Sequence, residues 1–144
     1  MKNPLNLEGQ CVAITGAAQG IGEAIARLAV DLGAKVALID VQGDKLLSLA
    51  KELGTDRAEA HVGSVADQEF VQATLRSVVA KHGAIHGLVN NAGIVRAALV
   101  ERMARETWQQ VIDVNLSGVF YCLQAAGQHM LDRRAKGDAG PAAI

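Results

Sequence analysis

The sequence predicts an α/β fold in which a parallel sheet carries helices on both faces. Two observations lead to this prediction. Short apolar runs alternate along the chain with segments whose apolar residues recur at helical spacing, and glycines close most of these segments. Strands that alternate with helices are typical of a doubly wound parallel sheet, because each helix returns the chain to the start of the next strand.

Four strands are expected. The first, 10–15, has no polar residue between Cys11 and Ile14, which is typical of a strand buried on both faces. The others are expected at 34–40, 57–63 and 85–90, of which 57–63 has the weakest pattern.

Three helices are expected between these strands. Their apolar residues recur every three or four positions, as on the buried face of a helix. Each pattern is followed by a glycine that can end the helix. The helices are expected over 21–32, 46–53 and 71–79, and the glycines are Gly33, Gly54 and Gly83.

A long final helix is expected from about Glu106 to about Arg134. Its apolar residues, at 111, 112, 114, 116, 119, 120, 122, 123, 126 and 130, occupy more than one face. A helix that is apolar nearly all round is buried nearly all round. One face can cover the sheet, and a second subunit is the simplest cover for the other. After a turn at 136–141, residues 142–144 are expected to begin a fifth strand.

Composition excludes several classes of partner. The 144 residues suffice for one domain with a substantial core. The net charge is −1, so no basic excess points to nucleic acid or an anionic membrane. The N-terminal residues lack the apolar core of a signal peptide, and no apolar run reaches the roughly 18 residues of a membrane span. We therefore expect a cytoplasmic protein.

Cysteine and histidine give no sign of a disulfide framework or a metal site. Cys11 and Cys122 lie singly inside apolar segments, which predicts buried, reduced thiols. His82 and His86 are four residues apart, but Gly83 lies between them just before an apolar run. The histidines have no metal-ligand spacing, so we expect no bound metal.

A glycine-rich turn joins the first strand to the first helix. Gly16, Gly20 and Gly22 form a GxxxGxG pattern. Glycine permits a tight turn and lets a phosphate approach the backbone closely. The helix N-terminus adds free N–H groups and partial positive charge. The pattern is equally compatible with a plain connection, so its interpretation depends on a second feature.

Asp40 is that second feature, because it ends the second strand. An acidic residue at this place can accept hydrogen bonds from the ribose hydroxyls of a dinucleotide, although it could also be a turn or N-cap residue. Together, the turn and Asp40 predict a dinucleotide site. A 2′-phosphate would be repelled by Asp40. Ala17, Ala18, Gln19 and Val41 offer no cation to compensate, so NAD is preferred over NADP.

A polar segment, VNNAG at 89–93, follows the fourth strand. Ligands of open α/β sheets bind at the carboxyl ends of the strands, and small residues there allow close approach of a ribose and a ring. Asn90 and Asn91 can cap strand ends or hold neighbouring loops. Taken alone, the segment could be a simple polar turn.

Together these motifs resemble the short-chain dehydrogenase/reductase family. TGAAQGIG at 15–22 resembles its glycine turn, NNAG at 90–93 its second signature, and VIDVNLSG at 111–118 its long-helix segment. The resemblance extends from about Leu7 to the last residue. It implies a Rossmann-type, three-layer α/β/α fold with strand order 3-2-1-4, truncated here at the start of the fifth strand.

The resemblance also implies an activity, hydride transfer between NAD and a secondary alcohol or ketone, with 3-oxoacyl thioesters as one substrate class. It implies dimers or tetramers that pack through the helix 106–134. The implied cofactor-binding residues are Gly16, Gln19, Gly20, Ile21, Gly22, Asp40, Val41, Ser64, Val65, Asn91, Ala92 and Gly93. Ser64 departs from the family pattern, which usually has Asp or Asn there.

The family's catalytic set is Asn, Ser, Tyr and Lys, of which this sequence shows only Asn115. Tyr121 cannot replace the family tyrosine, because Ala125 stands where the lysine should be. It also lies about 600° of helix rotation from Asn115, well off the same face. Residues 1–144 are therefore expected to form an incomplete NAD(P)-binding domain that is inactive alone. A non-catalytic nucleotide-binding fragment and a partner subunit remain as alternatives.

Overall fold

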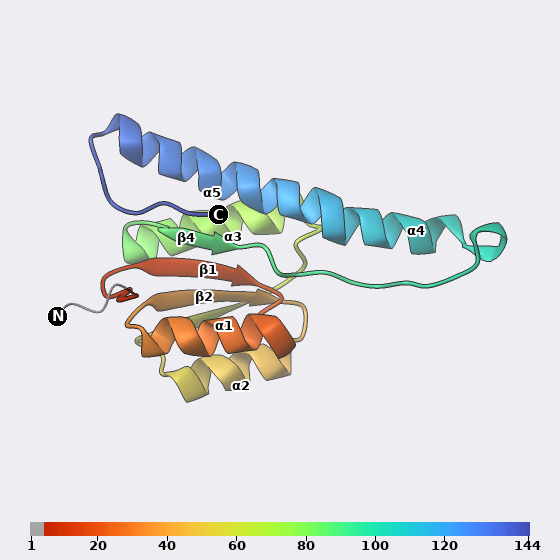
Figure 1. The fold of residues 1–144 in the computed structure, drawn as a ribbon, viewed down its shortest axis with the longest axis horizontal. Coiled ribbons are helices and arrows are strands. Elements are labelled where there is room, and N and C mark those ends of the chain that lie inside the picture. Colours follow the sequence, from red (N-terminus) through yellow and green to blue (C-terminus); the bar gives the residue numbers. More distant parts are fainter. Residues whose placement is uncertain (1–4) are drawn as a thin grey trace.

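The computed structural model of the chain describes residues 5–144 and contains a four-stranded parallel sheet (Figure 1). Its strands are β1 (Cys11–Thr15), β2 (Lys35–Asp40), β3 (Ala58–Val62) and β4 (Gly87–Val89). They pair in the order β3-β2-β1-β4, and every pairing is parallel. The predicted fold class and strand order are confirmed.

The register brings the carboxyl ends of the strands to one edge of the sheet. Thr15 of β1 lies opposite Ile39 of β2, and Asp40 lies opposite Val62 of β3. On the other side, Ile14 lies opposite Val89 of β4. The loops that follow all four strands therefore meet at this edge, where an open α/β sheet binds its ligands.

Helices cover both faces of the sheet (Figure 1). One face carries α1 (Gly20–Asp31) and α2 (Gly43–Leu53), and the other carries α3 (Gln68–His82) and α5 (Gly118–Ala135). Side chains of β2 alternate between the two cores, because successive residues of a strand point to opposite faces. Val36 and Leu38 pack in the α1–α2 core, whereas Ala37 and Ile39 pack in the α3–α5 core.

The helices α2 and α3 each begin three residues before the ranges predicted from their apolar residues. The reason is visible in α3, where the Asp67 side chain accepts the backbone N–H of Phe70 at 3.0 Å. This N-cap lets the helix begin at two polar residues, Gln68 and Glu69, which carry no apolar signal. The C-terminal end of α3 follows the prediction, since Gly83 adopts the left-handed conformation (φ +80°) that ends many helices.

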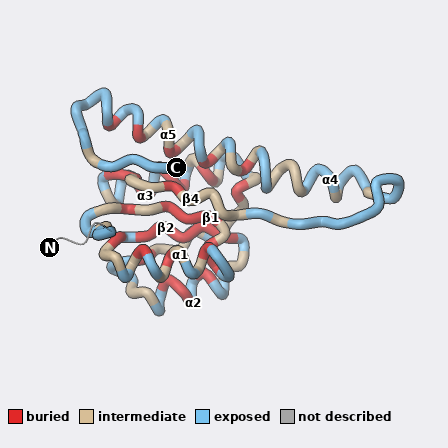
Figure 2. The backbone as a smooth tube through the Cα atoms, in the orientation of Figure 1, coloured by how far each residue is buried: buried red, intermediate tan, exposed pale blue. Residues whose placement is uncertain are grey.

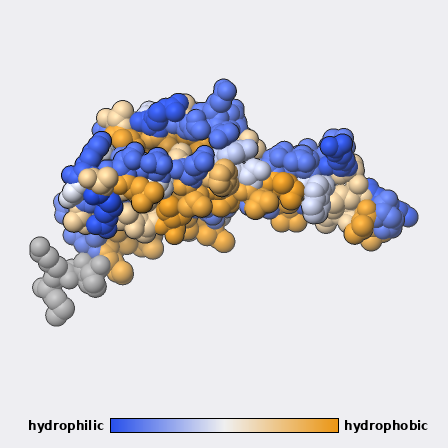
Figure 3. All heavy atoms as spheres, turned by 90° about the horizontal axis from the view of Figure 1, so that it is seen from above, coloured by the Kyte–Doolittle hydropathy of each residue, from blue (hydrophilic) through white to orange (hydrophobic). Residues whose placement is uncertain are grey.

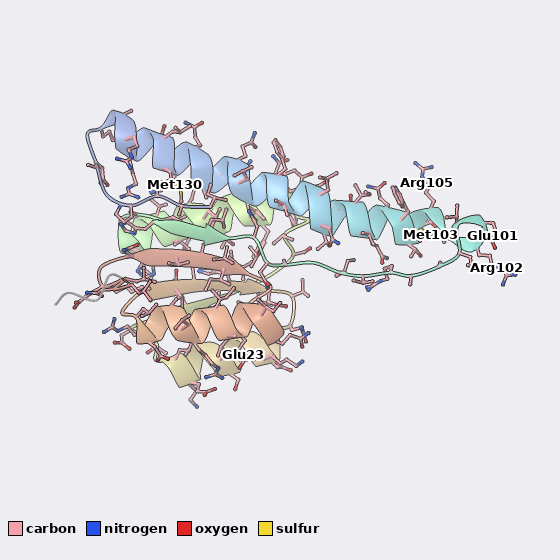
Figure 4. The ribbon with its side chains drawn as sticks, viewed as in Figure 1. Glu23, Glu101, Arg102, Met103, Arg105 and Met130 are labelled. Carbon is pink, nitrogen blue, oxygen red and sulfur yellow. The ribbon has the colours of Figure 1, made fainter. Side chains whose placement is uncertain are left out.

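The expected long helix is present but is not regular. It consists of α4 (Arg105–Ile112), a π-helical turn η2 (Asp113–Ser117) and α5, in direct succession. Figure 1 shows α4 projecting beyond the sheet, whereas α5 lies over it, with Met130 on the side that faces the sheet (Figure 4). One face of the helix covers the sheet, as expected, and the other face is exposed within this chain. Its cover by a second subunit stays a prediction.

Burial of the long helix follows a single stripe. The buried residues of α5 are Gly118, Cys122, Ala126, Met130 and Arg133, and α4 has none. Leu116 and Phe120 are 64% and 53% exposed. Figure 3 shows hydrophobic residues in a band that continues from the body of the molecule along the projecting segment.

The connection from β4 to α4 has no counterpart among the predicted elements. β4 is shorter than the expected strand, and the chain then runs without regular structure to a 3₁₀ turn, η1 (Val100–Arg102). This segment is almost wholly exposed (Figure 2) and turns back where Figure 4 labels Glu101 and Arg102. Val95 and Val100 on it are exposed side chains.

Residues near the C-terminal end pair beside β4, as expected for a fifth strand. Ala143 forms a parallel bridge with Gly87, through hydrogen bonds from Ala143 N–H to His86 O (3.1 Å) and from Leu88 N–H to Ala143 O (3.0 Å). Across residues 5–144, no helix combines the length and apolarity required to cross a membrane.

Candidate functional site

A cleft of about 370 Å³ opens at the carboxyl edge of the sheet. It is bounded by the glycine turn, the end of β2 and the loops after β3 and β4. Every residue predicted to bind cofactor lines this cleft except Ile21 and Gly22. The lining residues are Gly16, Gln19, Gly20, Ile39, Asp40, Val41, Gln42, Gly63, Ser64, Val65, Asn91, Ala92, Gly93, Ile94 and Val114.

A larger hollow of about 580 Å³ lies between α3 and α5 and contains none of the predicted site residues. Its polar lining comes mainly from helix surfaces, such as Gln72, Gln124 and Gln128. The motifs converge on the smaller cleft, so we take the smaller cleft as the candidate site.

The glycine turn needs its glycines for two different reasons. Gly16 and Gly20 have φ values of +65° and +59°, which favour glycine. A Cβ on Gly22 would lie 2.1 Å from the carbonyl oxygen of Gly16, so the helix can approach the turn only without a side chain. A Cβ on Gly20, by contrast, would meet nothing within 4 Å. Gly20 therefore borders open space.

The N-terminus of α1 lies at the same place and is not capped by a side chain. Gln19 occupies the N-cap position and makes no side-chain cap hydrogen bond. The N–H groups of the first turn are then available to an anion, and the partial positive charge of the helix end favours one. Open space at Gly20 and uncapped donors fit a diphosphate.

Asp40 is fixed where the glycine turn meets the start of α2. Its carboxylate accepts the backbone N–H of Ala18 at 3.0 Å with Oδ2 and that of Gln42 at 2.9 Å with Oδ1. The residue is only 9% exposed but lines the cleft. Each carboxylate oxygen can accept more than one hydrogen bond, so both retain capacity for a ribose hydroxyl. The bond to Gln42 is also an Asx turn, so the turn interpretation of Asp40 holds as well.

The NNAG segment is hydrogen-bonded to the glycine turn through Thr15 and Asn91. The Thr15 hydroxyl accepts the backbone N–H groups of Asn91 (3.1 Å) and Ala92 (3.0 Å) and donates to Val89 O (3.3 Å). The Asn91 amide donates to the carbonyls of Thr15 and Gly16, both at 3.1 Å. Asn91 therefore holds neighbouring loops. Thr15 begins the TGAAQGIG motif, but its contacts with the NNAG segment are visible only in the structure.

Asn115 lies in the π-helical turn and pairs with the backbone of Ile94. Its Oδ1 accepts the Ile94 N–H at 2.8 Å, and its Nδ2 donates to the Ile94 carbonyl at 2.9 Å. Its Oδ1 is also 3.6 Å from where a Cβ on Gly93 would lie. The fold thus brings the only visible member of the predicted catalytic set to the end of the NNAG segment. Irregular π turns occur frequently at functional sites.

The loop after β3 supplies the remaining predicted residues. The Ser64 hydroxyl accepts the backbone N–H of Ala66 at 3.1 Å, which stabilises the turn locally. Val65 is buried, and a Cβ on Gly118 would lie 2.7 Å from its Cγ2. Gly118 therefore lets the start of α5 pack closely on this loop, which fixes one wall of the cleft.

Tyr121 does not line the cleft. It packs partly buried against the α3–α5 core, and its ring lies edge-on to Phe120 with 6.1 Å between ring centroids. The interpretation of Tyr121 as a packing residue of the helix is confirmed.

Lys45 is a residue near the site that sequence reasoning missed. It lies in the first turn of α2, and its Nζ donates to Gln19 Oε1 at 2.7 Å. A cation therefore does stand beside the glycine turn, although none occurs at the turn positions themselves. No motif contains Lys45, and only the three-dimensional contact between α2 and the turn reveals it.

The two cysteines are free and buried, as predicted. Burial raises the pKa of both thiols to about 11, so neither is a ready nucleophile at neutral pH. Within the part of the chain that the structure describes, no three His, Cys, Asp or Glu side chains are grouped to hold a metal ion.

Comparison with known proteins agrees with this geometry. Residues 10–139 match the family model for short chain dehydrogenases. D-threitol dehydrogenase from Mycolicibacterium smegmatis is 42% identical over 129 residues, which are 88% of this chain and 49% of that protein. A 3-oxoacyl-acyl-carrier-protein reductase from Thermotoga maritima is 42% identical over 132 residues, or 90% of this chain and 54% of that protein.

A solved structure gives the same result. A metagenomic short-chain oxidoreductase in complex with NADP superimposes with a TM-score of 0.83 at 34% identity. The match covers 89% of this chain and 59% of that one. The chain spans about half the length of the curated relatives it matches.

Proposed function

This chain belongs to the short-chain dehydrogenase family, and from that membership we propose that it forms the NAD(P)-binding part of an oxidoreductase. The enzyme would interconvert a secondary alcohol and a ketone with NAD(H). The observation that carries the proposal is the cleft in which the glycine turn, the fixed Asp40 and the NNAG segment meet.

The proposed cofactor contacts are the twelve residues predicted from the sequence. The uncapped start of α1 beside Gly20 suits the diphosphate, and Asp40 suits the hydroxyls of the adenosine ribose. Ser64 and Val65 would flank the adenine. The dinucleotide supplies the hydride acceptor or donor when bound, and the residues of this chain bind and orient it. Asp40 favours NAD over NADP in this proposal.

Asn115 is the proposed catalytic residue of the described chain. One N–H of its amide and one lone pair of its oxygen are used by Ile94. A side-chain amide has two N–H donors and two lone pairs, so one donor and one acceptor remain. These could hold a water in a proton relay, while the bonds to Ile94 keep the amide in place.

The substrate class and the assembly are part of the proposal. The two curated relatives are named for a sugar alcohol and for a 3-oxoacyl thioester, so we propose a small molecule with a secondary alcohol or ketone. The exposed side chains of Leu116, Phe120 and Leu123 would be covered by a second copy, in a cytoplasmic homodimer or homotetramer.

Calorimetric titration with NADH tests the proposal, with reduced nicotinamide mononucleotide, which lacks the adenosine half, as control. We expect binding of NADH and none of the mononucleotide. An assay of NAD reduction with a panel of secondary alcohols follows. Binding without turnover would favour a nucleotide-binding fragment or partner subunit, and absence of NADH binding would refute the proposed function.

A further inference from the structure

The wall of the cleft that follows β3 has an aromatic side chain directly behind it. Gly63, Ser64 and Val65 line the cleft, whereas Phe70 does not. Phe70 lies in the first turn of α3 and packs, partly buried, against the α3–α5 core. A Cβ on Gly63 would lie 2.5 Å from Cζ and 2.7 Å from Cδ2 of the Phe70 ring. The ring is therefore in close contact with the backbone of this wall.

Gly63 is required at its position for space and not for its backbone conformation. It is not among the glycines with positive φ, so its backbone conformation does not itself demand a glycine. The three atoms nearest to the place of its Cβ all belong to the Phe70 ring. The ring thus occupies the space that a side chain at position 63 would need, and the two residues form a matched pair.

Hydrogen bonds fix the backbone on both sides of this contact. The Gly63 N–H donates to the carbonyl of Asp40 at 3.0 Å, and the Asp67 N–H donates to the carbonyl of Ser64 at 3.1 Å. The Asp67 carboxylate in turn accepts the N–H of Phe70 at 3.0 Å. The start of α3 is therefore tied to the wall, and the ring fills the space between the wall and the α3–α5 core.

We propose that Phe70 is a positioning residue for the adenine of the bound dinucleotide. Its ring supports Gly63 from behind and so sets how far the wall 63–65 extends into the cleft. A smaller side chain at position 70 lets the wall move back, and dispersion contacts with a flat base weaken steeply when a gap opens. The inference rests on the proposed function, in which Ser64 and Val65 flank the adenine.

Calorimetric titration with ADP-ribose tests the inference. This probe lacks the nicotinamide, so its affinity reports only the adenosine and diphosphate half of the cleft. Phe70→Leu removes the ring, Gly63→Ala places a methyl group where the ring lies, and a third variant combines the two. Val78→Ala is the control, because Val78 is fully buried about two turns further along α3 and does not line the cleft.

We expect Phe70→Leu and Gly63→Ala each to weaken ADP-ribose binding about five- to tenfold. In the combined variant the methyl group takes up part of the space that the ring has left. Its affinity should therefore be within about threefold of the unmodified protein, far from the product of the two separate losses. Val78→Ala should lower the urea midpoint of unfolding at least as far as Phe70→Leu does, and should change the affinity less than about twofold.

The outcomes separate this inference from the proposed function. If the unmodified protein binds ADP-ribose but Phe70→Leu binds it equally well, the role of Phe70 is refuted and the proposed function stands. The same conclusion follows if the two losses multiply in the combined variant, or if Val78→Ala weakens binding as much as Phe70→Leu. If the unmodified protein does not bind ADP-ribose, the proposed function itself fails. Circular dichroism identifies any variant that is not folded.

Discussion

The buried hydroxyl of Thr15 accepts the backbone N–H of Asn91 at 3.1 Å, across 76 residues of sequence. It also accepts the N–H of Ala92. One side chain at the end of β1 therefore satisfies two donors of the NNAG segment. This contact therefore ties the end of β1 to one wall of the candidate cleft.

Thr15→Val removes that acceptor at nearly constant volume. We expect the free energy of unfolding to fall by about 2 kcal/mol, because the part-buried N–H of Ala92 loses its acceptor and that of Asn91 keeps only the Val89 carbonyl, at 3.1 Å. Urea denaturation measures the loss. Thr55→Val, at an exposed turn position, is the control and should change stability by less than about 0.5 kcal/mol. Equal effects of the two variants would contradict a structural role for the Thr15 hydroxyl.

Gly22→Ala places a methyl group where the Gly16 carbonyl already lies. We expect a loss of at least about 3 kcal/mol of stability, or failure to fold, because both colliding groups are attached to backbone. Gly127→Ala in α5 is the matched control, since its Cβ would meet nothing within 4 Å. That variant should gain about 0.5–1 kcal/mol, because alanine favours a helix interior over glycine. Thermal unfolding of both variants checks the opposite signs.

Asp40→Ala should raise affinity for NADP relative to NAD. In the proposed site, the variant would remove the charge that repels a 2′-phosphate and the acceptor for a ribose hydroxyl. It also leaves the N–H groups of Ala18 and Gln42 without their partner, so the ratio of the two dissociation constants is the quantity to measure. A ratio equal to that of the unmodified protein would contradict the assignment of Asp40 to the ribose.

Acidification should destabilise the fold through two histidines at the amino-terminal edge of the sheet. His86 Nδ1 accepts the N–H of Cys11 at 2.9 Å, and His129 Nε2 accepts the N–H of Ile85 at 3.3 Å. A protonated ring cannot accept at these atoms. Burial lowers the pKa of both histidines, and the nearby Arg133 guanidinium lowers both further.

The direction of this pH effect on stability follows from the lowered pKa of the two histidines. In the unfolded chain the two histidines have pKa values of about 6.5. Below that pH the unfolded chain therefore binds more protons than the folded chain. The free energy of unfolding therefore falls as the pH drops from 7.5 to 5. The charged groups beside the rings are Arg133, Asp138, Asp132 and Lys136.

A double variant isolates the histidines from other acid-sensitive groups, such as Glu59, whose pKa is also lowered. His86→Gln with His129→Gln keeps a side-chain acceptor but cannot titrate. We expect urea denaturation to give a flatter pH dependence of stability for the double variant between pH 7.5 and 5. If the curves of unfolding free energy against pH are parallel for the double variant and the unmodified protein, other groups cause the loss of stability on acidification.

The sequence predicted a parallel sheet because the alternation of strands and helices is a local signal, and the resemblance to the family implied the strand order. It missed features that depend on contacts between distant segments. Lys45 reaches Gln19 only after α2 has packed beside the turn. The π-helical turn at Asn115 leaves the apolar pattern of the long helix intact, so periodicity could not reveal it.

What covers the second face of the long helix could not be predicted for a related reason. Apolar residues such as Phe120 indicate that this face of the helix is suited to burial. Periodicity does not say which element or subunit buries it, and within this chain the face is exposed. The extended connection after β4 was missed because it carries neither a helical nor a strand pattern.

The segment from 95 to 112 contains no buried residue. Opening it therefore exposes little apolar surface, and it can open without disturbing the sheet. Amide hydrogens of this segment should exchange with solvent through local opening, whereas those of β1 and β2 should exchange only on global unfolding. The two hydrogen bonds between Asn115 and Ile94 hold the segment near the cleft. A protease would find its first cleavage sites along this arm.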